Sequence, residues 1–181
     1  MNNKGFTLIE LLATLVILSL VMGIASAGVT SYIKTSKNKS EKVFVEKLSS
    51  SIEAYINLNG STLPKKDNTT YSFLKCRTST CNTDENSYTA TAYQVTSIYL
   101  TDLIRAKIID EAKVINPSNK EKCLSNGKNP EIKVYKDSDY VYYYYVDLSK
   151  TNTSCDISEE NGIIDTRPQK LKEAIEGESD T

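Results

Sequence analysis

The chain has 181 residues, of which 39% are hydrophobic and 25% are charged, with 22 basic against 23 acidic side chains. A net charge of −1 gives no electrostatic reason to expect nucleic acid as a generic partner, because such partners favour a basic surface. The sequence contains no histidine, which excludes Ser-His and Cys-His catalytic pairs and removes the commonest protein ligand of zinc and iron.

A long uncharged run lies near the N-terminus. Residues 11–33 contain no charged side chain, and the rest of the chain is polar and rich in Asn, Ser, Thr, Lys and Tyr. A helix needs about 20 apolar residues to cross the hydrocarbon core of a bilayer, so this run is long enough to span a membrane. We therefore expect one membrane segment that carries one soluble domain.

Two ordinary interpretations of this segment conflict with the acid at its start. A secretory signal peptide would use Lys4 as its basic start and Ala25-Ser26-Ala27 as its cleavage site, releasing a binding module or enzyme after Ala27. A plain membrane anchor is the other interpretation. Glu10 suits neither, because an ionisable side chain inside a membrane segment is costly unless it reaches the headgroups or has a function.

The residues around this acid resemble a known processing motif. Lys4 to Glu10 read KGFTLIE, directly before the apolar run, and this sequence is similar to the motif of type IV pilins and the related pseudopilins. The resemblance implies that prepilin peptidase cuts between Gly5 and Phe6 and methylates the new amine of Phe6. It also implies that Glu10 pairs with the Phe6 amine of a neighbouring subunit during assembly, a registry role for a buried ion pair.

The resemblance also implies a place and a set of partners. We expect a subunit that polymerises with itself or with related subunits, after contact with the peptidase and a membrane assembly platform. The head would lie outside the cytoplasmic membrane and later in a cell-surface filament serving adhesion or motility. A pseudopilin of a type II secretion or competence DNA-uptake system is the alternative. The sequence marks out no catalytic constellation and no cofactor, so we do not expect an enzyme.

The distribution of lysines favours the opposite membrane topology, with the head in the cytoplasm. Only Lys4 precedes the apolar run, whereas Lys34, Lys37, Lys39 and Lys42 follow it. Positive-inside counting alone would place the soluble domain in the cytoplasm. We give more weight to the processing motif and to the cysteines described below.

The apolar run is predicted to continue as one helix through residue 58. Val45, Leu48, Ile52 and Tyr55 form one helical stripe, which indicates a face that covers the globular domain, and Asn59-Gly60 is a good stop. Glycines in a helix interior cost about 1 kcal/mol each relative to alanine. We therefore predict that residues 23–28, with Gly23, Ser26 and Gly28, bend or melt during assembly.

After this helix the pattern changes to short strands and polar loops. We predict surface loops over 64–70 and 82–86, a strand over 93–100, a short helix over 102–108 capped by Thr101-Asp102, a turn at 116–118, and a hairpin of strands 131–135 and 140–148. Tyr140, Tyr142 and Tyr144 share one face of the last strand, and Val141, Tyr143 and Tyr145 share the other. Large side chains on both faces favour a core strand that packs against the long helix, with a sugar-binding tyrosine platform as the alternative.

Acids and cysteines of the head raise the question of metal. Asp137 and Asp139 in the hairpin turn are turn formers rather than calcium ligands. Cys76, Cys81, Cys123 and Cys155 allow three disulfide pairings, of which 76–81 closes a small loop and 123–155 encloses the hairpin. A four-cysteine zinc site is disfavoured by the wide 123/155 spacing. Pilins often have a disulfide around their C-terminal region, and the 123/155 pair resembles it; disulfides imply an oxidising exterior.

The predicted organisation is α+β and pilin-like, with a long N-terminal helix packed on a small antiparallel sheet. The parts are a leader (1–5), a transmembrane and assembly half of the helix (6–29), an amphipathic half (30–58), a globular head (59–155) and a tail (156–181). The tail is rich in acids, and we expect it to be flexible, with one short helix as the alternative.

Overall fold

The structure is a computed structural model that describes residues 7–77, 87–123, 130–149 and 155–177. The chain divides into two compact units, Met1–Ser40 and Glu41–Thr181. The described part of the first unit is helical from Leu8 onward, and the second unit contains the sheet. We call the second unit the head.

Helix α1 (Leu8–Asn59) ends beside the glycine predicted to stop it. A 3-10 turn (Gly60–Thr62) follows. Gly60 lies against the Tyr142 ring, where a Cβ atom would come within 3.1 Å of the ring, so a side chain here would disturb both elements. The end of α1 is thus fixed by the close packing of Gly60 against Tyr142.

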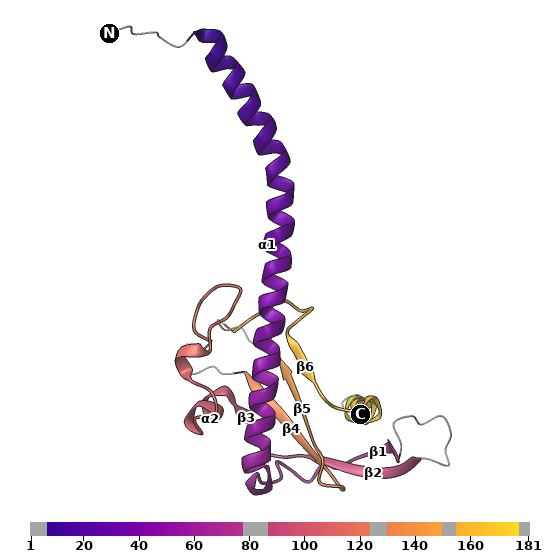
Figure 1. Cartoon of the computed structure of the whole chain (residues 1–181). Helices are drawn as coiled ribbons and strands as arrows, with labels where there is room; N and C mark the ends of the chain where they lie inside the picture. Colours follow the sequence, from indigo (N-terminus) through magenta and orange to yellow (C-terminus); the bar gives the residue numbers. More distant parts are fainter. Residues whose placement is uncertain (1–6, 78–86, 124–129, 150–154, 178–181) are drawn as a thin grey trace. The chain divides into compact units, whose positions relative to one another are not determined.

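The head is built on one antiparallel sheet (Figure 1). Its strands are β1 (Tyr71–Cys76), β2 (Ser87–Gln94), β3 (Ile98–Tyr99), β4 (Glu131–Asp137), β5 (Tyr142–Asp147) and β6 (Ile163–Asp165). The order across the sheet is β1-β2-β4-β5-β6, and β3 pairs with β4 outside this path. Helix α2 (Leu100–Arg105), a 3-10 turn (Glu111–Lys113) and helix α3 (Gln169–Gly177) complete the head.

One face of the sheet packs against the part of α1 that belongs to the head. Leu48, Ile52 and Ile56 are at most 4% exposed and share a core with Val134 and Tyr144 of the sheet. Val45 and Tyr55 pack at the margin of this core. The predicted helical stripe and the predicted core role of the β5 strand are therefore confirmed.

The other face of the sheet has a smaller core of its own. Phe73, Ala90, Ala92 and Tyr135 pack there with Leu171 of α3, and Tyr143 lies beside them. Alternate residues of β4 and β5 point to opposite faces, so both faces of these central strands are covered. The α+β, pilin-like class expected from the sequence is confirmed, with a long apolar N-terminal helix followed by an antiparallel sheet.

The expectation of a flexible tail is wrong for the residues that the structure describes. Strand β6 pairs with β5 through Ile164 opposite Val146, and α3 buries Leu171 completely. The acid content of the tail concealed this pattern, because the few apolar residues fall where a strand and an amphipathic helix need them. The alternative of one short helix is confirmed by α3.

The prediction of one continuous strand over 93–100 is also wrong, although both ends of this range contain strand residues. Strand β2 ends at Gln94, β3 comprises only Ile98 and Tyr99, and α2 already begins at Leu100. Between them the backbone N–H of Val95 donates to Val134 O at 2.9 Å and that of Thr96 donates to Pro64 O at 2.8 Å. The apolar run thus changes partners midway, which local alternation does not reveal.

Other predicted elements agree more closely. Strands β4 and β5 form the predicted hairpin, with Val134 opposite Tyr144. The predicted helix over 102–108 is shifted to Leu100–Arg105, and Asp102 accepts a hydrogen bond from the Tyr99 backbone at 2.8 Å as the third helical residue rather than as the cap. Residues 64–70 lie at the surface, 117–119 form a turn, and 82–86 lie outside the described residues.

Candidate assembly site

The first described turn of α1 is closed by the acid that the sequence singled out. Glu10 Oε2 accepts hydrogen bonds from the backbone N–H of Thr7 at 3.0 Å and from Thr7 Oγ1 at 2.8 Å. Thr7 directly precedes the helix, so Glu10 is its third residue and forms one half of a capping box. The acid therefore satisfies a backbone donor that a helix start otherwise leaves unpaired.

Apolar side chains on all sides of this segment are exposed in the single chain. The large apolar side chains of residues 8–22 are between 51% and 79% exposed. They are Leu8, Ile9, Leu11, Leu12, Leu15, Val16, Ile17, Leu18, Leu20, Val21 and Met22. A helix that is hydrophobic all round requires a lipid or protein environment. Within the described residues, α1 is the one helix that is long and apolar enough to cross a membrane.

Comparison with known families agrees with this geometry. Residues 1–26 carry the prokaryotic N-terminal methylation motif. This motif is typical of type IV pilins and pseudopilins, and it supports a pilin- or pseudopilin-type substrate of prepilin peptidase. No curated protein and no solved structure matches the chain.

The methylation motif includes every residue that we assigned to processing and assembly. Gly5 and Phe6 lie within the matched residues but outside those that the structure describes. Glu10 is described, and its observed contacts are to Thr7 of its own chain. Cleavage after Gly5, methylation of Phe6 and a contact of Glu10 with a neighbouring subunit therefore remain predictions.

A second acid of α1 has a structural role that the sequence analysis missed. Glu41 is fully buried; its Oε1 accepts a hydrogen bond from Ser118 Oγ, and its Oε2 accepts from Ser158 Oγ and, at 2.9 Å, from Asn161 Nδ2. Three neutral donors from two loops thereby solvate one buried carboxylate. The available signal was spacing, since Glu41 lies four residues before Val45 on the core-facing stripe.

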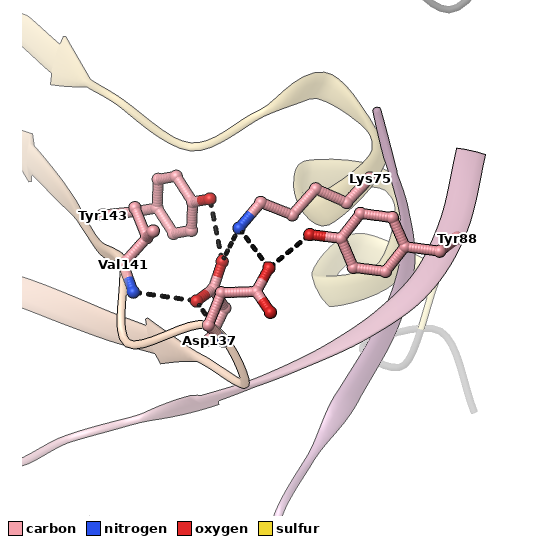
Figure 2. A network of polar contacts seen from close by, with 6 residues as sticks. Lys75, Tyr88, Asp137, Val141 and Tyr143 are labelled. Carbon is pink, nitrogen blue, oxygen red and sulfur yellow. Dashed lines mark hydrogen bonds and ion pairs between the residues drawn. The ribbon is translucent and has the colours of Figure 1, made fainter. Parts of the chain in front are cut away.

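The acids of the hairpin turn both bind a lysine (Figure 2). Lys75 Nζ donates to Asp137 Oδ2 and to Asp139 Oδ2, each at 2.7 Å. Tyr143 donates to Asp137 Oδ2 at 3.0 Å, and Tyr88 donates to Asp139. The described residues contain no group of three potential metal ligands, and the lysine ammonium supplies the positive charge between the two carboxylates.

This cluster also fixes the hairpin turn. Asp137 Oδ1 accepts the backbone N–H groups of Asp139 at 2.9 Å and Val141 at 2.8 Å, and the intervening Tyr140 adopts a left-handed φ of 64°. Although burial opposes ionisation of Lys75, the hydrogen bonds that it donates to Asp137 and Asp139 raise its pKa above its usual range. The pKa of Asp139 is lowered by its hydrogen bonds with Lys75 and Tyr88. The cluster ties β1 to the β4–β5 turn as an ion pair.

The tyrosines considered above as a sugar-binding platform contact other residues of the same chain. Tyr144 is 3% exposed in the core. The Lys136 ammonium lies 4.6 Å from the Tyr140 ring centroid and 5.4 Å from that of Tyr142. These rings thus already have a cationic partner in the same chain.

The three cysteines that the structure describes are in two chemical states. Cys76 is disulfide-bonded, and its predicted partner Cys81 lies outside the described residues. Cys123 and Cys155 are buried thiols, with Cys155 Sγ donating to Cys123 O at 2.9 Å. The hydrogen bond with Cys155, together with burial, raises the pKa of the Cys123 thiol. The structure thus brings Cys123 and Cys155 together, and their disulfide stays a prediction.

Proposed function

We propose that the chain is a structural subunit of a type IV pilus-like filament that polymerises through its apolar N-terminal helix. The observation that carries this proposal is the methylation motif, followed directly by an uncharged helix with exposed apolar side chains. The motif also favours a structural subunit over an enzyme. We propose adhesion or motility as the role of the filament.

The proposed assembly begins with processing. Prepilin peptidase cuts between Gly5 and Phe6 and methylates the amine of Phe6, which leaves the apolar run intact. Helices of neighbouring subunits, supplied by the membrane assembly platform, then cover one another's apolar side chains, so this surface stays out of water after the subunits leave the bilayer.

Glu10 sets the stagger between neighbouring helices in this scheme. Its Oε2 is engaged by Thr7, while Oε1 accepts no hydrogen bond within the described residues. A carboxylate has lone pairs for several donors. The Phe6 amine of a neighbouring subunit can therefore bind Glu10 without breaking the cap, and this pairing compensates the charge that assembly buries.

A pair of variants separates the charge of Glu10 from its capping role. Glu10→Gln keeps an oxygen that accepts from Thr7 but removes the charge, whereas Thr7→Val keeps the charge and removes the hydroxyl donor. Breaking a buried ion pair costs about 3–5 kcal/mol, and a tenfold loss requires only about 1.4 kcal/mol. We expect the filament yield in sheared fractions to fall at least about tenfold in Glu10→Gln and to persist in Thr7→Val.

The same preparation tests the proposal as a whole. Long fibres containing this chain would support the pilus subunit. Membrane-bound material without long fibres would instead indicate a pseudopilin of a secretion or DNA-uptake system. Equal fibre yields from the wild type and Glu10→Gln would contradict the role assigned to Glu10.

We also propose disulfides between Cys76 and Cys81 and between Cys123 and Cys155. In the second case two thiols transfer two electrons and two protons to a disulfide-exchange partner outside the cytoplasm. Because buried protonated thiols react slowly, this bond has to form before the core closes. We expect the folded, reduced chain to resist oxidation and the chain refolded with oxidised glutathione to carry the bond, as measured by peptide mass spectrometry. Rapid oxidation of the folded chain would contradict this order.

A further inference from the structure

Three lysines follow the apolar run on α1 without an intervening acid. Lys34, Lys37 and Lys39, which we call the lysine collar, are all exposed. The residues between them are Thr, Ser and Asn, and the next acid along the helix is Glu41. The collar is therefore a short segment of α1 with three positive charges, directly after the part of the helix that is suited to a bilayer.

The collar has no counter-charge of its own in the described structure. None of its three lysines forms an ion pair within the described residues, whereas Lys75, Lys170 and Lys172 each have an acidic oxygen within 3.1 Å. Glu41 is the nearest acid along the chain, but it is fully buried and bound to Ser118, Ser158 and Asn161. The acid closest in sequence is thus buried and hydrogen-bonded inside the head.

The spacing along the helix suits a bilayer surface. Lys34 is the first residue after the uncharged run and Lys39 is five residues further, which is about 8 Å at a rise of about 1.5 Å per residue. Headgroup layers extend several Å beyond the hydrocarbon core, and the Debye length is about 8 Å at physiological salt. When the uncharged run lies in the hydrocarbon core, all three ammonium groups therefore come within the range of lipid phosphates at its end.

We propose that the lysine collar binds the phosphates of anionic lipid headgroups and holds the unassembled subunit at that surface. This inference rests on the membrane anchoring that is part of the proposed function. It also gives a reason for the lysines that oppose the positive-inside rule. Their charge is directed at lipid, while the processing motif determines export. When subunits assemble and leave the bilayer, these contacts must be released.

The test uses the full chain in vesicles of phosphatidylcholine containing spin-labelled phosphatidylglycerol or spin-labelled phosphatidylcholine. Electron spin resonance gives the association of each labelled lipid with the protein. A lysine near an anionic surface contributes up to about fivefold in affinity. We expect the wild type to prefer phosphatidylglycerol several-fold, and high salt to weaken this preference because exposed charges are screened.

A matched pair of triple variants identifies the lysines responsible. Replacing Lys34, Lys37 and Lys39 with glutamine should abolish the preference, whereas replacing Lys47, Lys107 and Lys113, which are exposed lysines of the head, should retain it. Equal association of both lipids with the wild type, or a preference that survives in the collar variant, would overturn the inference alone. Release of the wild type from the vesicles by an alkaline wash would overturn membrane anchoring as well.

Discussion

The two units of this chain treat apolar surface in opposite ways. In Glu41–Thr181 one face of α1 and the sheet enclose a core of apolar residues, and no described buried side-chain nitrogen or oxygen lacks a partner. In Met1–Ser40 the described large apolar side chains are more than half exposed. The comparison shows that one helix serves two purposes along its length. The head is complete in itself, whereas the N-terminal unit needs lipid or other subunits.

The largest effect should come from breaking the buried ion pair of the head. Asp137→Ala removes a side chain that is fully buried. It leaves two backbone N–H groups and Tyr143 without this acceptor, and Lys75 keeps only Asp139 as its acidic partner. Such a loss costs about 3–5 kcal/mol, to be measured by urea unfolding. Asp139→Ala, at a side chain that is 40% exposed, is the control and should cost much less, because solvent weakens the ion pair of an exposed carboxylate. Equal losses would show that burial does not decide the effect.

A comparable loss should show that the C-terminal residues belong to the head. Leu171→Ala removes a fully buried side chain from the second core, which should lower the free energy of unfolding by about 2–5 kcal/mol. Lys170→Ala, next to it and exposed, should change it by no more than about 0.5 kcal/mol. If both variants matched the wild type in thermal unfolding, α3 would not stabilise the sheet.

A smaller effect is expected at alkaline pH. Burial, reinforced by the hydrogen bond to Glu53, raises the pKa of Tyr144 to about 12. The folded state thus keeps a proton that the unfolded chain releases near pH 10. Stability from this group is fully present below about pH 10 and is lost as the pH rises toward 12.

Tyr144→Phe should therefore flatten the dependence of unfolding free energy on pH above about pH 10. Tyr140→Phe, at a side chain that is 76% exposed, is the control. An unchanged slope in Tyr144→Phe would contradict the assignment of this proton to Tyr144.

The smallest effect belongs to the N-terminal unit. A Cβ atom added at Gly23 or Gly28 would meet no neighbouring atom within 4 Å, so alanine fits at both positions. Each replacement should stabilise the helix by about 1 kcal/mol and leave unfolding of the head unchanged. We expect residues 23–28 to exchange amide hydrogens faster than the flanking turns in the wild-type filament, and more slowly in the double alanine variant. Uniform protection in the wild type would contradict a bend or melted turn there.

Local patterns predicted those parts of the fold that depend on few neighbours. The stripe through Leu48 and Ile52 and the β4–β5 hairpin both appear where periodicity and turn residues placed them. The methylation motif is a continuous sequence, so the candidate site at Gly5, Phe6 and Glu10 needed no tertiary information.

The missed features depend on contacts between distant residues. Strand β1 is recognisable only through its pairing with β2, and Glu41 is understood only through loops more than seventy residues away. Lys75 of β1 likewise meets Asp137 of β4 across the intervening strand β2. Average acidity suggested a free tail, whereas Leu171 and Ile164 decided its fold. Sequence patterns describe a residue's neighbours along the chain, and tertiary contacts can override them.

The most direct test of the central claim is the mature N-terminus of the protein, taken from its native membrane or sheared fraction and measured by mass spectrometry. Our account predicts a chain that begins at Phe6 with one added methyl group on its amine. A chain that begins at Gly28 would mean cleavage by signal peptidase and loss of the whole apolar segment. That result would contradict the proposed assembly at its first step.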